Sequence, residues 1–355
     1  MAVILTDNDP AFPAITRDEL QAARRRIRPH ALRSPAVRFD PTSDGSSGPE
    51  IYLKLEMLQP VGSFKLRPAA NAVEAFEERH PGMLRSRGIV TASSGNWAQG
   101  LAWMTALRGI PYTVVVPTSC PAAKIANIRR LNPRSRIAKC DEDEFWRVVT
   151  TREFAGADPN AVFLSSVCDR DTIAGGGTIG AELAEDFPWL HERGGDAIDA
   201  VLCPTGGGAM AIGIAAALHF YGCPRVRVYA VESEHASPFA AEWGTAPLRA
   251  HNRGSFVDCI GNKAIFPGME RFARAALAGS LVVGEAECAR AVRLLAERSK
   301  VVAEGGSAAA LAAALRYGRE KGWRRVIALI TGGSIDLEKL AVCLKGGVPG
   351  RASKL

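Results

Sequence analysis

The chain has 355 residues, of which 47% are hydrophobic and 23% are charged, and its formal net charge is +7. This composition is typical of a soluble globular protein, and the length favours two lobes over a single core. The first residues lack a basic segment followed by an apolar stretch, and no apolar run is long enough to cross a bilayer. We therefore expect neither secretion nor membrane insertion.

The excess of positive charge does not indicate a nucleic-acid-binding protein. The basic residues lie mainly in short pieces of helical pattern, such as 24–26 and 324–325, and no DNA- or RNA-binding motif accompanies them. The eight cysteines are scattered without a close pair, which fits neither a disulfide framework nor a zinc site. We expect reduced thiols in the cytoplasm, or in the peroxisome if the final Ser353-Lys354-Leu355 is read as a targeting signal.

The predicted elements alternate between helices and strands along the chain. The first is an amphipathic helix over residues 18–27, for which Thr16 is a candidate N-cap with Glu19 three residues later. A strand over 51–55 and a helix over 67–78 follow. Further strands are expected over 88–92, 112–116, 136–139, 200–203, 226–231 and 326–330, and further helices over 96–107, 121–131, 177–187, 209–220 and 307–317.

The apolar strands have no alternation of polar and apolar residues, which indicates that both of their faces are buried. Continuous apolar strands joined by helices predict mostly parallel sheets that are covered by helices on both faces. In such α/β folds, ligands bind where loops leave the carboxyl ends of the strands. Three loops rich in glycine or serine lie at such ends in this chain.

The loop Gly206-Gly207-Gly208-Ala209 connects a predicted strand to a predicted helix. Consecutive small residues let backbone N–H groups converge, and the helix N-terminus adds positive potential, so a phosphate fits there. The spacing of a dinucleotide motif is absent, and so is a GK[ST] sequence. A monophosphate site is favoured over a nucleotide site, and a tight packing turn is the structural alternative.

Two further loops carry residues that could react with a ligand or bind one. Lys65 follows Gly62-Ser63-Phe64, and taken alone it is either an ordinary exposed lysine or one that forms an imine. The loop over residues 91–96 offers hydroxyls and free N–H groups at the start of a helix, which would hold a carboxylate. A simple helix cap by Ser94 or Asn96 would use the same donors.

Six short segments place the chain near one known family. They are residues 62–65, 93–96, 173–178, 206–208, 304–308 and 331–333. With these segments in this order and at these intervals, the chain from about residue 15 to residue 340 resembles the serine/threonine dehydratase and serine racemase family of fold-type II pyridoxal-phosphate (PLP) enzymes, which are tryptophan synthase β-like. The resemblance implies a two-lobed α/β fold of twisted sheets, in which a small lobe (residues 78–164) is inserted in a large one (residues 1–77 and 165–355).

The resemblance also implies a role for each candidate residue. Lys65 would form the Schiff base with PLP and take the Cα proton of the substrate. Asn96 would bond the 3-hydroxyl of the cofactor, and Thr331 its pyridine nitrogen. The other residues expected at the cofactor are Phe64, Gly206, Gly207, Gly208, Ala209, Met210 and Glu304, and those expected at the substrate carboxylate are Ser93, Ser94 and Gly95.

A neutral partner such as Thr331 makes the ring a weaker electron sink than an aspartate partner does, which favours prompt loss of a β-substituent. We therefore predict β-elimination from a β-hydroxy or other β-substituted amino acid, which gives a 2-oxo acid and ammonia. Ser94 matches the second acid/base of the racemases, so an amino-acid racemase is an alternative. A β-replacement enzyme and a catalytically idle ligand-binding homologue are two others. The resemblance further implies a homodimer without the regulatory domain through which isoleucine inhibits some relatives.

Three positions depart from the family pattern. Trp97 stands where the family usually has histidine, and it either reshapes the substrate pocket or packs inward. Arg170 lies in a loop where relatives tend to have proline, and it faces either an acidic substrate group or solvent. Glu232 and Ala236 match a cation site of many relatives, but Pro238 replaces the last carboxylate. Glu234 and His235 are candidate replacement ligands, and because a structural role suits both of them better, no metal is predicted.

Overall fold

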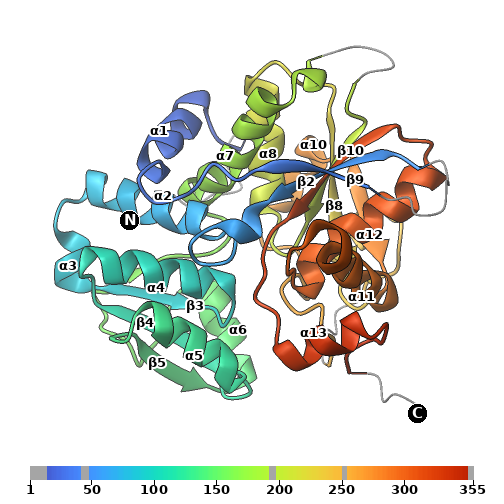
Figure 1. The fold of residues 1–355 in the computed structure, drawn as a ribbon. Helices are drawn as coiled ribbons and strands as arrows, with labels where there is room; N and C mark the ends of the chain where they lie inside the picture. Colours follow the sequence, from blue (N-terminus) through green and yellow to red (C-terminus); the bar gives the residue numbers. More distant parts are fainter. Residues whose placement is uncertain (1–13, 41–47, 192–196, 250–253, 351–355) are drawn as a thin grey trace.

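The computed structural model describes residues 14–40, 48–191, 197–249 and 254–350 of the chain. Its elements form two α/β lobes, each built around one sheet (Figure 1). The strands are β1 (Ala36–Phe39), β2 (Glu50–Leu55), β3 (Ile89–Ala92), β4 (Tyr112–Pro117), β5 (Arg136–Cys140), β6 (Val162–Phe163), β7 (Ala200–Pro204), β8 (Arg227–Ser233), β9 (Gly279–Val283) and β10 (Arg325–Ile330). The helices are α1 (Arg17–Ile27), α2 (Leu66–Arg79), α3 (Met83–Arg87), α4 (Asn96–Arg108), α5 (Ala122–Leu131), α6 (Glu142–Thr151), α7 (Arg170–Asp186), α8 (Ala209–Phe220), α9 (Pro238–Glu242), α10 (Glu270–Ala276), α11 (Glu285–Leu294), α12 (Gly305–Glu320) and α13 (Leu337–Leu344).

The large lobe contains a six-stranded sheet in the order β1-β2-β10-β7-β8-β9. All neighbouring strands are parallel except β1 and β2. Side chains of β10 alternate between the two faces: Ile327 and Leu329 belong to one hydrophobic cluster, with α1, α7, α8 and α10, whereas Val326 and Ala328 belong to another, with α11 and α12. Both faces of the sheet are therefore buried under helices, as the apolar strands predicted.

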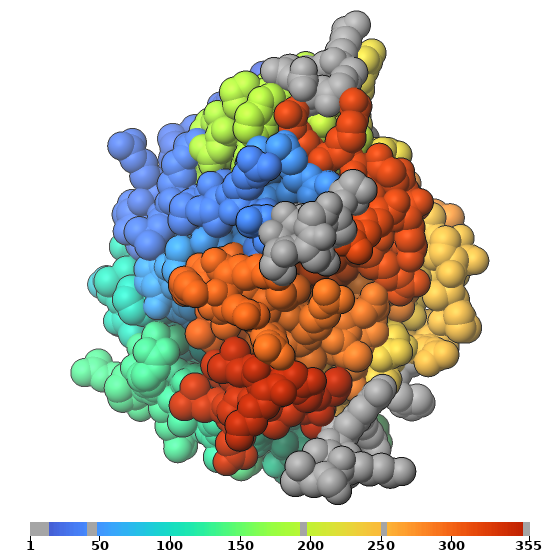
Figure 2. Space-filling view, turned by 45° about the vertical axis from the view of Figure 1, so that its right-hand side comes forward, coloured from blue at the N-terminus to red at the C-terminus, as the bar shows by residue number. Residues whose placement is uncertain are grey.

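The small lobe contains a four-stranded parallel sheet in the order β5-β4-β3-β6. Residues of α2, α4 and α5 form the core on one face, and Val148 of α6 packs on the other with Val90 and Val115. Figure 2 shows a face on which the last third of the chain, orange to red, forms much of the surface of the large lobe, with the small lobe, cyan to green, at the lower left. The fold class is confirmed, and the lobe boundaries at residues 77/78 and 164/165 stay predictions that the two separate sheets support.

Glycines allow α7 to pack very closely against α2 and α8. A Cβ on Gly175 would lie 2.5 Å from the Cα of Pro68 in α2, and a Cβ on Gly213 of α8 would lie 2.3 Å from the carbonyl oxygen of Ile173. The prediction that this helix begins at residue 177 is wrong, since α7 begins at Arg170. The glycines of residues 175–177 serve helix packing and not a turn, because each lacks a side chain that would separate the helices.

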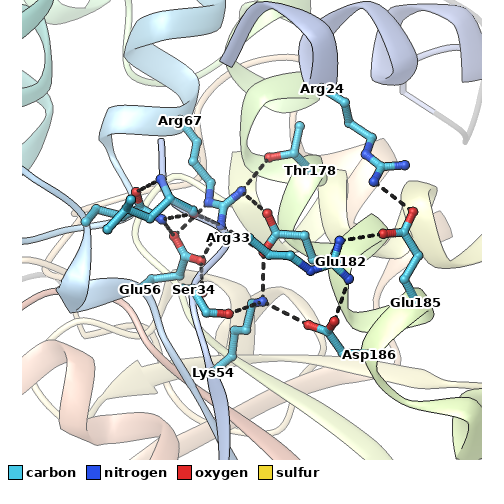
Figure 3. Close-up of polar contacts among 12 residues, drawn as sticks. Arg24, Arg33, Ser34, Lys54, Glu56, Arg67, Thr178, Glu182, Glu185 and Asp186 are labelled. Atoms are coloured by element: carbon cyan, nitrogen blue, oxygen red, sulfur yellow. Dashed lines mark hydrogen bonds and ion pairs between the residues drawn. The ribbon is translucent and has the colours of Figure 1, made fainter. Parts of the chain in front are cut away.

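A network of buried charges joins the end of β2 to α2 and α7 (Figure 3). The Arg67 guanidinium donates to both carboxylate oxygens of Glu56, at 2.8 Å each, and to both oxygens of Glu182, at 2.7 and 2.9 Å. Lys54 Nζ donates to Glu182 Oε2 at 2.7 Å and to the Ser34 carbonyl oxygen at 2.8 Å. The two cations and the two carboxylates satisfy one another, as burial of charge requires.

Several expectations on local structure and composition are resolved by the fold. Thr16 caps α1 in a capping box with Glu19, as predicted. All eight cysteines are free thiols. Among the helices of the described ranges, none combines the length and apolarity needed to cross a membrane. The tripeptide 353–355 lies outside the described residues.

Candidate active site

A cavity of about 360 Å³ lies between the two lobes, and every candidate site residue of the sequence lines it. Four loops meet there, and they follow the carboxyl ends of β2, β3, β7 and β10. Parallel strands place their carboxyl ends at one edge of a sheet. Because β2, β7 and β10 belong to the large-lobe sheet and β3 to the small-lobe sheet, segments far apart in the sequence converge on the cavity from two sheets.

The loop that carries Lys65 is fastened to the loop after β10. The Phe64 N–H donates to the Thr331 carbonyl oxygen at 2.9 Å, and the Gly333 N–H donates to the Gly62 carbonyl oxygen at 3.0 Å. Gly62 has a φ of 76°, which a residue with a side chain rarely adopts. The backbone thereby fixes where Lys65 starts, and Thr331 lies beside it in the cavity wall.

Lys65 lines the cavity, and its amine is surrounded by protein. Its Nζ lies 5.0 Å from the centroid of the Phe64 ring and 5.8 Å from that of Trp97. It makes no hydrogen bond or ion pair within the described residues. Desolvation of the charged form lowers the pKa of Lys65 to about 8. A lysine with this pKa has a usable fraction of neutral amine near physiological pH, which imine chemistry requires.

The glycine-rich loop after β7 is shaped for an anion. Gly208 has a φ of 87° and precedes α8, and no side chain caps this helix. A Cβ on Gly207 would lie 1.9 Å from Cγ1 of Val167, so only glycine allows this loop to lie so close to the segment that contains Val167. Within the described chain, the N–H groups of residues 206–211 donate no hydrogen bond, and they remain available to a phosphate.

The loop after β3 presents a second helix N-terminus to the cavity. Gly95 is the N-cap of α4 and no side chain caps the helix, so the structural alternative of a simple cap by Ser94 or Asn96 is wrong. The Ser93 hydroxyl accepts from the Gly95 N–H at 3.3 Å, and Ser94 lines the cavity. Uncapped N–H groups beside two hydroxyls are suited to a carboxylate.

Asn96 and Glu304 form a hydrogen-bonded pair on opposite lobes. Asn96 Nδ2 donates to Glu304 Oε1 at 2.7 Å. Burial, with the charge of Asp258 adding to it, raises the pKa of Glu304 to about 7. Gly332 makes room for this carboxyl group, because a Cβ there would lie 2.1 Å from Glu304 Oε1.

Trp97 and Arg170 both have structural partners within the protein. Trp97 is 2% exposed, its Nε1 donates to Thr91 Oγ1 at 2.9 Å, and it belongs to the small-lobe core while also lining the cavity. Arg170 donates to both carboxylate oxygens of Glu19 in α1, at 2.8 Å each. Arg170 was predicted to face either an acidic substrate group or solvent. Its contact with Glu19 instead connects α7 to α1.

The carboxylate at the position of the relatives' cation site has protein partners instead. Glu232 accepts from the N–H groups of Phe239 and Ala240, at 3.0 and 2.7 Å, and from the Ser280 hydroxyl at 2.6 Å. Burial raises the pKa of Glu232 to about 7. Glu234 accepts from the Glu285 N–H at 2.9 Å. The described part of the chain contains no cluster of three histidine, cysteine or acidic side chains arranged for a metal ion.

The structure adds a wall that the sequence analysis did not predict. The cavity is closed on the small-lobe side by α5 and α6 and on the large-lobe side by residues 258–266. The added residues include Lys124, Phe145, Trp146, Val149, Asp258 and Phe266. The sequence does contain an N-cap pattern for α6, since Asp141 is followed by Glu144 three residues later. In the structure, Asp141 Oδ1 accepts a hydrogen bond from the Glu144 N–H at 2.8 Å.

The residues of the cavity fit PLP. The Lys65 amine, which has no polar partner in the described residues, would hold the PLP aldehyde. The N–H groups of the glycine-rich loop 206–208 would hold its phosphate. The uncapped N-terminus of α4 would hold the carboxylate of an amino-acid substrate. These three groups come from different segments of the chain, and no packing requirement within the protein explains all of them together. The fit therefore rests on the shape and the hydrogen-bonding capacity of the cavity.

Comparison with known proteins agrees with this fit. A family model described as pyridoxal-phosphate dependent enzyme matches residues 27–332. The chain is 33% identical to L-threonine ammonia-lyase of Thermotoga maritima, over 94% of this chain and 79% of the relative. It is 30% identical to beta-hydroxyaspartate dehydratase of Paracoccus denitrificans, over 92% of this chain and 98% of the relative. A solved pyridoxal 5'-phosphate-dependent aspartate racemase has a TM-score of 0.78 and 27% identity, and the match covers 94% of this chain and 99% of that one. The chain therefore belongs to the family of pyridoxal-phosphate-dependent enzymes, as its resemblance predicted.

Proposed function

We propose that this PLP-dependent enzyme removes the β-substituent of a β-hydroxy amino acid and releases a 2-oxo acid and ammonia. The observation that carries the proposal is Lys65, whose amine lacks a polar partner within the described residues and faces a cavity that Thr331 also lines. The names of two relatives, a threonine ammonia-lyase and a β-hydroxyaspartate dehydratase, support elimination as the reaction class.

Four parts of the chain would hold the cofactor. The N–H groups of residues 206–210 would bind the phosphate, Thr331 the ring nitrogen and Asn96 the 3-hydroxyl, and Lys65 would attach covalently. Bound PLP withdraws electrons from the Cα of an attached amino acid and so makes its proton acidic. A hydroxyl partner such as Thr331 limits this withdrawal, which favours prompt departure of the β-hydroxyl group.

Lys65 would then act as the base that takes the Cα proton. Burial desolvates the charged form of Lys65 and lowers its pKa to about 8, which keeps a fraction of the amine neutral near neutral pH. The uncapped start of α4, with Ser93 and Ser94, would hold the substrate carboxylate. These contacts orient the Cα–H bond toward the amine and exclude water from it.

A racemase is the second candidate, and Ser94 is the observation that favours it. Its hydroxyl lines the same cavity as the Lys65 amine and would serve as a second acid/base. One of the similar solved structures is an aspartate racemase. Elimination and racemisation share the first proton transfer, so the two activities differ only in the later steps, which are loss of the β-substituent or return of a proton to the opposite face.

Measuring all products of one incubation separates these functions. The holoenzyme is incubated with β-hydroxy amino acids while 2-oxo acid, ammonia and the inverted stereoisomer are followed. The proposal expects equal amounts of 2-oxo acid and ammonia. Inverted isomer without ammonia would establish the racemase instead, and a protein that binds no PLP would contradict both.

Assembly and compartment stay predictions. We propose a homodimer, on the basis of the resemblance alone, and light scattering of the holoenzyme would measure its mass. We propose the cytoplasm as the compartment, with the peroxisome as the alternative that the tripeptide 353–355 raises. Imaging of the full chain with and without this tripeptide would decide between them.

A further inference from the structure

Three apolar side chains of α6 line the cavity and belong to no core. Phe145, Trp146 and Val149 face the same cavity as Lys65, and none of them is part of the four hydrophobic clusters that the described residues form. Val148, between them in the sequence, is fully buried in the small-lobe core. Helix α6 therefore packs through one face and presents another apolar face to the cavity.

The rings of this wall are held in place by neighbouring polar groups. The Trp146 Nε1 donates to Glu142 Oε1 at 3.2 Å, and the amine of Lys263 lies 5.4 Å from the centroid of the indole ring. The Phe145 and Trp146 rings meet edge to face, with centroids 5.6 Å apart. A fixed apolar surface of this kind loses little conformational entropy when it is covered by a ligand.

The large lobe supplies apolar residues to the same cavity. Ile260, Phe266 and Val167 line it, and Phe266 packs on the core of the large lobe. The α6 wall and this second set of side chains come from different lobes and enclose one space. An apolar group placed between them would exchange contact with water for contact with protein on more than one side.

The charges of the cavity do not match a second anionic group on the substrate. Among the described residues that line it, Lys65 and Lys124 are the cations, and there is no arginine or histidine. Lys263 is not part of this lining, and its amine lies against the Trp146 ring. Lys124 Nζ already pairs with Asp258 Oδ2 at 3.0 Å. Glu142 and Glu304 also line the cavity. A negatively charged side chain would compete with Asp258 for the Lys124 amine and would face further carboxyl groups.

We propose that α6 selects β-hydroxy amino acids whose β-substituent is apolar and of aromatic size, with β-phenylserine as the model compound. The proposal rests on the elimination function proposed above and adds the substrate class to it. Phe145, Trp146 and Val149 contact the β-substituent, while Lys65 and the start of α4 hold the amine and the carboxylate. Anionic substrates such as 3-hydroxyaspartate are disfavoured by the same wall.

The first test compares substrates on the holoenzyme. The stereoisomers of β-phenylserine, serine, threonine and 3-hydroxyaspartate are supplied separately, and kcat/KM is measured from 2-oxo acid and ammonia. We expect the best phenylserine isomer to exceed serine by about tenfold or more, since each added methylene in an apolar pocket is worth roughly 10- to 200-fold. A higher kcat/KM for serine or for 3-hydroxyaspartate would overturn the proposal.

The second test uses two neighbouring valines of α6 as a matched pair. Val149→Ala removes cavity wall, and Val148→Ala removes the same atoms from the core. The first change is expected to lower the kcat/KM ratio of phenylserine over serine about tenfold. The second is expected to lower the stability of the protein without changing this ratio. An equal shift of the ratio in both variants, or in neither, would contradict the role of the wall.

A third variant and a binding measurement keep the two proposals distinguishable. Trp146→Arg places a cation in the wall, so it is expected to reduce turnover of phenylserine and to raise that of 3-hydroxyaspartate.

Phenylalanine and aspartate, which lack a β-hydroxyl, are then tested by their effect on the absorbance of the holoenzyme. Tighter binding of phenylalanine with no elimination from any substrate would support the wall and overturn the elimination function. Tighter binding of aspartate would overturn the wall.

Discussion

Lys54 and Lys65 lie in the same stretch of chain, and each is followed by leucine, yet the fold gives them opposite surroundings. Lys54 is 0% exposed, and its amine donates to Glu182 and to the Ser34 carbonyl oxygen (Figure 3). Lys65 faces the cavity between the lobes and has no polar partner within the described residues. The difference teaches that burial alone does not make a lysine a candidate for imine chemistry, because a buried amine that is paired with carboxylates is a structural cation.

Removing Lys65 has the largest expected effect on activity. Lys65→Ala deletes the covalent attachment and the base, so kcat should fall by about 10⁴-fold or more, as for other catalytic groups that act together. The free energy of unfolding of the apoenzyme should hardly fall, because the amine makes no polar contact with the described residues. Steady-state kinetics and urea denaturation measure the two quantities. A variant with substantial residual turnover would remove Lys65 from the mechanism.

Removing Lys54 is expected to do the reverse. Lys54→Met leaves the carboxylates of Glu182 and Asp186 with too little positive charge, and breaking a buried ion pair costs about 3–5 kcal/mol. The variant should still attach PLP and keep the absorbance of the holoenzyme. Lys345→Met, at an exposed position, serves as the control for the loss of one surface lysine. If Lys54→Met lost the cofactor at unchanged stability, the contrast between the two lysines would be wrong.

The pH dependence of cofactor attachment tests the electrostatics of Lys65. Only the neutral amine reacts with an aldehyde, and the pKa of Lys65 is lowered from 10.5 to about 8. The rate of attachment of added PLP to the apoenzyme should therefore rise about tenfold per pH unit below pH 8 and level off above it. Stopped-flow absorbance measures this rate. A rise that continues toward pH 10 would show that the amine is solvated like an ordinary lysine.

The smallest expected effect comes from the edge of the charge network. Thr178 Oγ1 accepts a long hydrogen bond of 3.4 Å from Arg67 Nη1, whose other hydrogen bonds are shorter. Thr178→Val removes this bond and the hydrogen bond of 2.7 Å that Thr178 Oγ1 donates to the Gly175 carbonyl oxygen. It should lower the free energy of unfolding by about 2 kcal/mol, at roughly 1 kcal/mol for each bond. The PLP attachment rate should stay unchanged. A change in that rate would link the network to the chemistry of Lys65.

The sequence predicted the fold class and the loops of the candidate site because both depend on local patterns. Gly206–Gly208 and the segment 93–96 are short, contiguous and placed at strand ends, so their position in an α/β fold follows from the fold itself. The helix predicted from residue 177 left Gly175 and Gly176 outside it, although both lie within α7. Their value lies in contacts with α2 and α8, which only the tertiary structure contains.

The α6 wall could not be derived from the sequence in the same way. Phe145, Trp146, Val148 and Val149 form one apolar group in the sequence, and only the packing of α6 separates Val148, in the core, from the other three, in the cavity. The partner that Lys54 and Arg67 share, Glu182, was equally hidden, since it lies in a helix that comes after the whole small lobe. Long-range pairing of this kind leaves no local signal.

The close packing of α2, α7 and α8 suggests that cofactor retention and substrate choice can be changed separately by protein engineering. The helix that follows Lys65 and the helix that begins at the glycine-rich loop are joined through α7 at distances that admit no side chain. Two of the segments expected to hold PLP, the Lys65 loop and the glycine-rich loop, are thus attached to one closely packed block of helices, while the side chains of α6 lie outside that block. A library restricted to residues 145, 146 and 149 should consequently yield enzymes with new substrates that still retain PLP, whereas equal diversity at residues 175–177 should yield mainly empty protein.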